Sequence, residues 1–241
     1  GKVTKETYNG IRGSKTLNVY TTYNYDQSHK YNILYLMHGG VDNENTLFYQ
    51  NDTMIQKLLD NMIMNGELDP LIVVTPTFNG TGSEAGNFYE ELRKSVIPFV
   101  EGKYSTYAES TSEADIKASR MHRAYGGFSM GGLSTWCVAD HDMDIVGYFM
   151  PLSGNNWEGM NKLTGEIDSL GFSQRDYFIF AATGDQDIAY NNMKPEMEDL
   201  KTRTKYFTYT SDFSKGNLYW LVAPSVGNNK KTHWWGFVRW Y

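Results

Sequence analysis

A serine between two glycines, in Gly127-Phe-Ser-Met-Gly131, is the group in this chain best suited to act as a nucleophile. The pattern G-x-S-x-G is typical of a nucleophile elbow, a sharp strand-to-helix turn that exposes a serine hydroxyl. Glycines are needed there because the turn brings the two backbones too close for a side chain. The alternative interpretation is a Gly-rich turn with a surface serine. The pattern therefore predicts Ser129 as a nucleophile if a base and an acid accompany it.

The base that Ser129 needs is expected to be a histidine later in the chain. Such a base removes the hydroxyl proton, and a carboxylate orients it. In hydrolases with this elbow the order is Ser, then Asp or Glu, then His, and only His141 and His233 follow Ser129. We expect His141 in a solvated loop about a helix length away. His233 follows an apolar strand and a polar loop, so we predict it as the base; a packed histidine beside two tryptophans is the alternative.

The acid is expected directly after a buried strand between the serine and the histidine. Residues 176–182 form an apolar run fit for a parallel strand, and Thr183-Gly-Asp-Gln-Asp187 follows it. Asp185 and Asp187 both fit this position. The residues alone do not separate them, because either could instead cap the next helix. Asp176 begins the strand and therefore lies at the wrong end.

An oxyanion hole requires two backbone N–H groups aimed at one point. The residue after the nucleophile supplies one of them, here Met130. The other comes from the loop after an earlier strand, and residues 33–37 form a strand pattern that ends in His38-Gly-Gly40. We predict Gly40 as the second donor. His38 is predicted to orient this loop and not to act as a catalyst.

Strands that alternate with helices must position these residues, which indicates an α/β fold with a mainly parallel central sheet and helices on both faces. We expect strands at residues 16–21, 33–37, 71–75, 124–128, 145–150, 176–182 and 217–223, with the first one antiparallel. Helices are expected at residues 54–63, 88–100, 132–139 and 193–201. Segments 79–87 and 225–231 are expected as loops near the carboxyl edge of the sheet, where such folds bind ligands.

The composition is that of one compact domain over residues 1–241. The absence of a run of 18 apolar residues argues against a membrane span, and a net charge of -6 without a basic patch argues against nucleic acid as a partner. Cys137, the single cysteine, is expected to be buried. No metal-ligand pattern such as H-E-x-x-H is present, so neither a metal nor a cofactor is expected. The start Gly1-Lys2-Val3 resembles no signal peptide, and we expect a domain taken from a longer protein.

Several motifs occur together along the chain. They are Tyr35-Leu-Met-His-Gly-Gly40, Asn43-Glu-Asn-Thr46, Gly127-Phe-Ser-Met-Gly-Gly132, Tyr148-Phe-Met-Pro-Leu-Ser-Gly154, Gly184-Asp-Gln-Asp-Ile-Ala-Tyr190, Tyr209-Thr-Ser-Asp-Phe-Ser-Lys-Gly216 and His233-Trp-Trp-Gly-Phe-Val-Arg239. As a set, they resemble the feruloyl esterase domains of carbohydrate esterase family 1, and most of all the domain joined to bacterial xylanases.

This resemblance implies an α/β-hydrolase fold and a serine esterase that releases ferulate from arabinoxylan or a xylo-oligosaccharide. It implies that the acid is Asp187, just before Ile-Ala-Tyr190, and not Asp185. It also implies that His233 is the base and that Trp157 lines the ferulate pocket. With it we expect a secreted, extracellular enzyme, attached to xylanase or carbohydrate-binding modules.

Some features depart from the family's pattern and leave the substrate less fixed than the chemistry. Val41 stands where the nearest relatives carry a third glycine, and its side chain could narrow the mouth of the site or move the oxyanion loop. The loop before His233 is longer by residues 227–231, and the segment between Trp157 and residue 176 is shorter. The alternative functions are an esterase for a small acyl group, as in acetyl xylan, and a non-catalytic glycan-binding domain.

Overall fold

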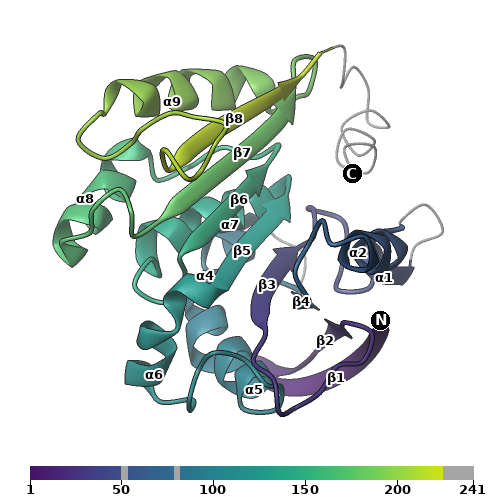
Figure 1. The fold of residues 1–241 in the computed structure, drawn as a ribbon. Helices are drawn as coiled ribbons and strands as arrows, with labels where there is room; N and C mark the ends of the chain where they lie inside the picture. Colours follow the sequence, from purple (N-terminus) through teal and green to yellow (C-terminus); the bar gives the residue numbers. More distant parts are fainter. Residues whose placement is uncertain (50–53, 79–81, 225–241) are drawn as a thin grey trace.

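The computed structural model describes residues 1–49, 54–78 and 82–224. Within these residues the strands form one sheet in the order β1-β2-β4-β3-β5-β6-β7-β8 (Figure 1). The strands are β1 (Lys2–Gly10), β2 (Gly13–Thr21), β3 (Asn32–Met37), β4 (Leu71–Thr75), β5 (Arg123–Phe128), β6 (Tyr148–Leu152), β7 (Phe178–Gly184) and β8 (Leu218–Ala223).

The sheet is mainly parallel, as predicted. Strands β4, β3, β5, β6, β7 and β8 run parallel, while β2 is antiparallel to both β1 and β4. The predicted antiparallel strand at residues 16–21 is therefore confirmed as β2. Strand β1 was not predicted, because its side chains are mostly polar and only Tyr8 among them is buried.

The two faces of the sheet are covered by different helices. Along β3, Ile33, Tyr35 and Met37 face a large core, while Leu36 belongs to a smaller core on the other face. The large core is covered by α3 (Gly82–Gly86), α4 (Phe88–Glu91), η1 (Leu92–Val96), α5 (Ile97–Glu101), α6 (Glu113–Ala118), α7 (Met130–His141), α8 (Met160–Leu170) and α9 (Tyr190–Thr202). The smaller core lies under α1 (Thr46–Tyr49) and α2 (Ile55–Met64). Helices on both faces are thus confirmed (Figure 1).

The helix predicted at residues 88–100 is present but contains a π-helical turn. The segments α4, η1 and α5 follow one another without a break, and η1 is the π turn. Pro98 has no N–H to donate and is placed in the first turn of α5. A first-turn position tolerates proline because its N–H would have no partner within that helix. The π turn thus lies directly before the segment that carries this proline.

Several predicted boundaries were wrong. Strand β6 begins at Tyr148 and not at residue 145, because Ile145 and Val146 donate their N–H groups to the Asp142 carbonyl in a turn. The strand predicted at 176–182 is β7, which runs from residue 178 to residue 184. Part of the loop predicted at 79–87 is the short helix α3. None of the helices in the described residues combines the length and the hydrophobicity that a membrane span requires.

Candidate active site

Ser129 occupies the strained strand-to-helix turn that the sequence predicts. It lies between β5 and α7, with φ 58° and ψ −113°, a region that residues other than glycine rarely adopt. A Cβ atom on Gly127 would lie 2.6 Å from the carbonyl carbon of Gly131. Glycine is therefore required at this position, and the predicted elbow geometry is confirmed.

The loop with the predicted oxyanion donor lies directly against this elbow. A Cβ atom on Gly131 would lie 2.5 Å from the Met37 carbonyl oxygen, so the start of α7 touches the end of β3. A Cβ atom on Gly40 would lie 2.9 Å from Cγ of Met130. The structure thus brings together Gly40 and Met130, whose N–H groups are the two predicted oxyanion donors.

His38 holds the peptide between the two glycines of this loop. Its Nδ1 lies 2.7 Å from the Gly39 carbonyl and its Nε2 lies 2.8 Å from Thr77 Oγ1. Burial lowers the pKa of His38, so the neutral ring has one N–H, which must donate from Nδ1 because a carbonyl only accepts. Thr77 then donates to Nε2. In a trans peptide the Gly40 N–H points opposite to the fixed Gly39 carbonyl, which agrees with a loop-orienting His38.

Val41, where the family's pattern has a third glycine, points into solvent. Its exposed fraction is 99%. The close approach of Gly40 to Met130 is therefore kept with valine at position 41, and the side chain does not fill the space between the loop and the elbow.

The two candidate acids differ in where they lie and what they contact. Asp187 is 6% exposed, and its Oδ1 accepts a hydrogen bond from the Ala189 N–H at 2.8 Å. Its Oδ2 accepts a hydrogen bond from Ser153 Oγ at 3.3 Å. Asp185 is partly exposed, and its N–H donates to the Ala223 carbonyl at 2.9 Å, which continues the pairing of β7 with β8. The contact with Ser153 directs the Asp187 carboxylate toward the strand next to the elbow.

Ser153 links the acid to the elbow and was missed by the sequence analysis. It follows β6 with φ 46°, and its N–H donates to the Ala182 carbonyl of β7 at 2.8 Å. The Ser129 N–H donates in turn to the Leu152 carbonyl of β6 at 2.8 Å. The ends of β5, β6 and β7 are thereby joined at one edge of the sheet. The available signal was the position of Ser153 directly after a strand that neighbours the elbow.

Of the two histidines considered as the base, His141 and His233, the structure describes only His141. His233 and the loop 225–231 lie outside the described residues. His141 was predicted in a solvated loop, and this was wrong: it is the last residue of α7. Its ring stacks on Tyr89 at 4.2 Å, and its Nε2 lies 2.9 Å from the Glu158 carboxylate. A twelve-residue helix is roughly 18 Å long, which places His141 far from Ser129.

Trp157 projects from a loop that starts at the elbow. A Cβ atom on Gly154 would lie 2.4 Å from the Ser129 carbonyl oxygen, so this loop touches the elbow three residues before Trp157. The exposed fraction of Trp157 is 63%, although tryptophan usually buries most of its surface. The indole ring is therefore available to a ligand.

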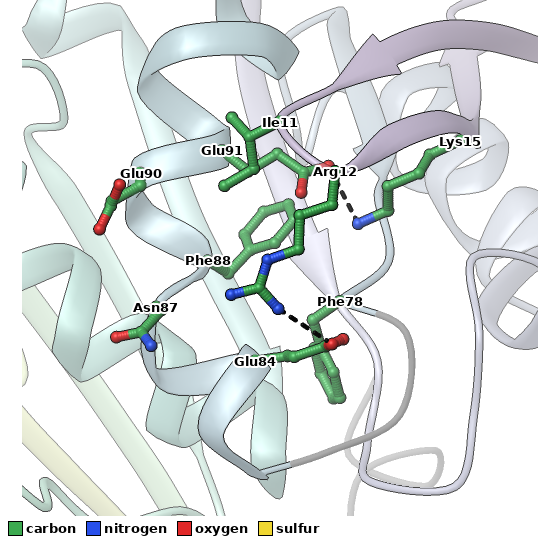
Figure 2. Close-up of a pocket in the computed structure, with 9 residues that line it drawn as sticks. All are labelled: Ile11, Arg12, Lys15, Phe78, Glu84, Asn87, Phe88, Glu90 and Glu91. Carbon is green, nitrogen blue, oxygen red and sulfur yellow. Dashed lines mark hydrogen bonds and ion pairs between the residues drawn. The ribbon is translucent and has the colours of Figure 1, made fainter.

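A separate cavity of about 170 Å³ lies between the β1–β2 turn and α4 (Figure 2). Arg12 pairs with Glu84 at 3.2 Å, and Lys15 pairs with Glu91 at 2.9 Å. The cavity is also lined by Phe78, which is buried. The centroid of the Phe78 ring lies 4.5 Å from that of the His38 ring. The charged groups are already paired and none of the predicted site residues lines this cavity, so it is not the candidate active site.

Neither metal binding nor thiol chemistry is supported within residues 1–49, 54–78 and 82–224. No group of three or more His, Cys, Asp or Glu side chains there is arranged to hold a metal ion. Cys137 is buried in α7, as predicted, and burial raises the pKa of its thiol to about 12. The thiol therefore stays protonated and unreactive near neutral pH.

A protein-family model, Esterase, described as "Putative esterase", matches residues 9–203, which is most of the chain. This chain belongs to the Esterase family. The matched range contains the elbow, the His38 loop and Asp187, while the predicted base, His233, lies beyond it.

Curated relatives of this esterase are longer proteins. It is 59% identical over 247 residues to endo-1,4-beta-xylanase Y of Acetivibrio thermocellus, covering 100% of this chain and 22% of that protein. It is 30% identical over 156 residues to an endo-1,4-beta-xylanase/feruloyl esterase of Xylanibacter ruminicola, covering 59% of this chain and 20% of that protein. The esterase thus spans about a fifth of the length of the curated relatives that it matches.

Solved structures share its fold. A Ser-to-Ala mutant of the feruloyl esterase module from Clostridium thermocellum, complexed with sinapinate, is 59% identical with a TM-score of 0.93, covering 99% of this esterase and 84% of that chain. A ferulic acid esterase of the fungus Anaeromyces mucronatus is 18% identical with a TM-score of 0.69, covering 98% of this esterase and 89% of that chain. At this identity, the similarity supports a shared fold and no more. The predicted α/β-hydrolase fold and carboxylic ester hydrolase class are confirmed.

The esterase carries a buried acid near the end of α7 that makes its stability depend on pH. Asp140 is fully buried, and its Oδ2 accepts a hydrogen bond from Asn156 Nδ2 at 2.8 Å. Burial raises the pKa of Asp140 to about 8. The unfolded value is about 4, so protonation favours the folded state. This contribution to stability is present at low pH and is lost as the pH rises through the folded pKa.

We therefore expect Asp140→Asn to flatten the pH dependence of unfolding. One proton contributes at most about 1.4 kcal/mol per pH unit to the change in unfolding free energy. The wild type should lose stability relative to Asp140→Asn between about pH 5 and pH 8, because its carboxyl ionises in the unfolded state while burial keeps it protonated in the folded state. Urea unfolding of both proteins across this range measures the difference. Parallel stability curves would show that Asp140 does not titrate in this way.

Proposed function

We propose that this chain is a feruloyl esterase that hydrolyses ferulate esters of arabinoxylan or of xylo-oligosaccharides. The observation that carries the proposal is the 59% identity, over 99% of the chain, to a feruloyl esterase module complexed with sinapinate. Sinapinate is a hydroxycinnamate like ferulate. An aromatic acyl group of this class is therefore the favoured substrate.

The proposed reaction passes through an acyl-enzyme formed on Ser129. His233 takes the proton from the serine hydroxyl as Oγ attacks the ester carbonyl, and it later gives that proton to the leaving sugar alkoxide. Asp187 holds the imidazole in the correct tautomer. The N–H groups of Met130 and Gly40 stabilise the tetrahedral oxyanion. Water then attacks the acyl-enzyme and releases ferulate. The reaction requires no metal or other cofactor.

The described part of the site supports these roles. The strained turn places Ser129, which is half-buried, directly before the start of α7. Gly40 lies against Met130, and the buried Asp187 carboxylate is tied to Ser153 beside the elbow. These groups come together at the carboxyl edge of the parallel strands, where α/β folds bind their ligands. The role of His233 is proposed from the chain order serine, acid, histidine and from the family resemblance.

Further proposals concern the protein around this site. We infer that residues 1–241 act as a single esterase domain, and that in the whole protein this domain is joined to a xylanase or to carbohydrate-binding modules. The names and lengths of the curated relatives support this arrangement. Because arabinoxylan is a cell-wall polymer, the proposed place of action is extracellular.

We propose that the exposed indole of Trp157 stacks on the acyl group, and we expect Trp157→Ala to lower kcat/KM for methyl ferulate about tenfold or more. Stacked aromatic pairs contribute roughly 0.5–1.5 kcal/mol beyond area burial, and 1.4 kcal/mol corresponds to a factor of ten. The effect on a small acetyl ester should be much weaker, because that acyl group does not reach the ring. Wild type and variant are compared on methyl ferulate, p-coumarate, caffeate, sinapate and an acetyl ester.

The same comparison tests the proposed substrate class. A wild type that prefers the acetyl ester over all the hydroxycinnamates would favour an acetyl xylan esterase instead. Equal losses on both classes in Trp157→Ala, or a fall in melting temperature that explains the ferulate loss, would make Trp157 a structural residue.

A further inference from the structure

The loop that presents Trp157 is fastened to the helix that follows the nucleophile. This loop spans residues 154–159. At its start, Trp136 Nε1 of α7 donates to the Gly154 carbonyl at 2.9 Å. Near its end, the Glu158 carboxylate lies 2.9 Å from Nε2 of His141, the last residue of α7. The loop is thereby attached to α7 on both sides of the tryptophan.

Asn156 is the central residue of this arrangement. Its Nδ2 donates to Asp140 of α7 at 2.8 Å, and its backbone N–H donates to Glu196 of α9 at 3.1 Å. Its Oδ1 accepts from the N–H groups of Glu158 at 2.8 Å and Gly159 at 3.1 Å. One buried side chain thus bridges the backbone on either side of residue 157 and joins the loop to α7. Its backbone N–H joins the loop to α9.

These bonds hold the backbone while the Trp157 ring stays outside. Asn156 is 4% exposed and Asp140 is fully buried, whereas Trp157 is 63% exposed. Glu196 is partly buried and also accepts a hydrogen bond from Asn155 Nδ2 at 3.3 Å. A ring on a fixed backbone loses less conformational entropy when it binds a ligand, so a rigid support strengthens binding without touching the ligand.

We propose that Asn156, held by Asp140 and Glu196, is a positioning residue that fixes Trp157 and thereby sets the preference for aromatic over small acyl groups. The proposal rests on the proposed feruloyl esterase function. The two helices that hold the loop are α7, which follows Ser129 and contacts the loop through its last residues, and α9, which begins three residues after Asp187. The acyl-binding ring is therefore held by the same helices that follow the nucleophile and the acid.

The test compares Asn156→Ala with Asn217→Ala in the complete chain. Asn217 is also a fully buried asparagine, which accepts from the Thr208 N–H at 2.9 Å and donates to the Tyr206 carbonyl at 3.1 Å. It precedes β8, at the edge of the sheet opposite the site. We expect Asn156→Ala to lower kcat/KM for methyl ferulate about fivefold or more, mostly through KM, with an acetyl ester changed less than about twofold. Asn217→Ala should leave the ratio of the two substrates unchanged.

A double-mutant cycle with Trp157→Ala decides whether Asn156 acts through the tryptophan. If it does, Asn156→Ala should have no further effect on the substrate ratio once the ring is absent. Independent, multiplying effects on the ratio would overturn the proposal. If Asn156→Ala does not fold, Glu196→Ala removes the bonds from α9 and is expected to change the ratio in the same direction.

The outcomes separate this inference from the function on which it rests. A wild type without preference for hydroxycinnamates, or a Trp157→Ala variant with an unchanged ratio, would contradict the proposed function and its acyl pocket. A changed ratio in Trp157→Ala together with an unchanged ratio in both Asn156→Ala and Glu196→Ala would leave that function standing and refute only the positioning role.

Discussion

Replacing Ser129 with alanine should lower kcat for methyl ferulate by a factor of about 10³ or more, because no other group can form the acyl-enzyme. The residual rate would come from the oxyanion donors and substrate binding alone. Single-turnover and steady-state assays with methyl ferulate measure the loss. A variant that kept a tenth of the wild-type activity would show that Ser129 is not the nucleophile.

Alanine is a suitable replacement because it keeps the Cβ atom. The turn has φ 58° at residue 129, and the cost of placing a Cβ there is the same for serine and alanine. The fold should therefore persist, which a melting curve checks. A fluorophosphonate probe, which reacts with activated serines, should label the wild type and not the variant. Labelling of the wild type would also exclude the non-catalytic glycan-binding domain.

Asp187→Asn should lower kcat by a factor of about 10³–10⁴, while Asp185→Asn should have a far smaller effect. Only the carboxylate bonded to the imidazole sets its tautomer, and an amide in that place favours the wrong one. The two substitutions are matched in chemistry and lie two residues apart on one loop. Steady-state kinetics of both variants on methyl ferulate give the comparison.

The structure gives a physical reason to favour Asp187. Its carboxylate is buried and held by Ser153 Oγ and the Ala189 N–H, which fixes its direction at the edge where Ser129 lies. The backbone of Asp185 continues the pairing of β7 with β8, and its side chain is more exposed. Equal effects of the two substitutions, or a larger effect of Asp185→Asn, would mean that the acid is Asp185.

Much of the fold could be predicted because its signals are local. The apolar runs of β3, β4, β5 and β7 and the glycines of the elbow each act within a few residues of the chain. The approach of Gly40 to Met130 was also expected, since loops after neighbouring parallel strands meet at one edge. The strand predicted at residues 145–150 starts too early, because the first apolar residues of that run lie in a turn that packs into the core. Ile145 and Val146 are apolar because they are buried, and not because they belong to a strand.

The supports of the site could not be predicted from the sequence. Ser153 contacts Asp187, which lies 34 positions later, and Asn156 contacts Glu196, which lies 40 positions later. No periodicity or local motif encodes such pairs, since a serine or an asparagine in a loop is equally common on the surface. For the same reason, the local sequence could not decide between Asp185 and Asp187 as the acid. What distinguishes them is a contact to another strand end.

The candidate site draws on four separate strand ends, and this shapes how the enzyme acquires activity as it folds. Gly40 follows β3, Ser129 follows β5, Ser153 follows β6 and Asp187 follows β7. These strands are neighbours in the sheet but are joined by long crossovers, so their pairing closes large loops of chain. Neither half of the chain contains all four of these residues. We therefore expect hydrolysis to require the pairing of these four strands, and a folding intermediate with any one of them unpaired should be catalytically silent.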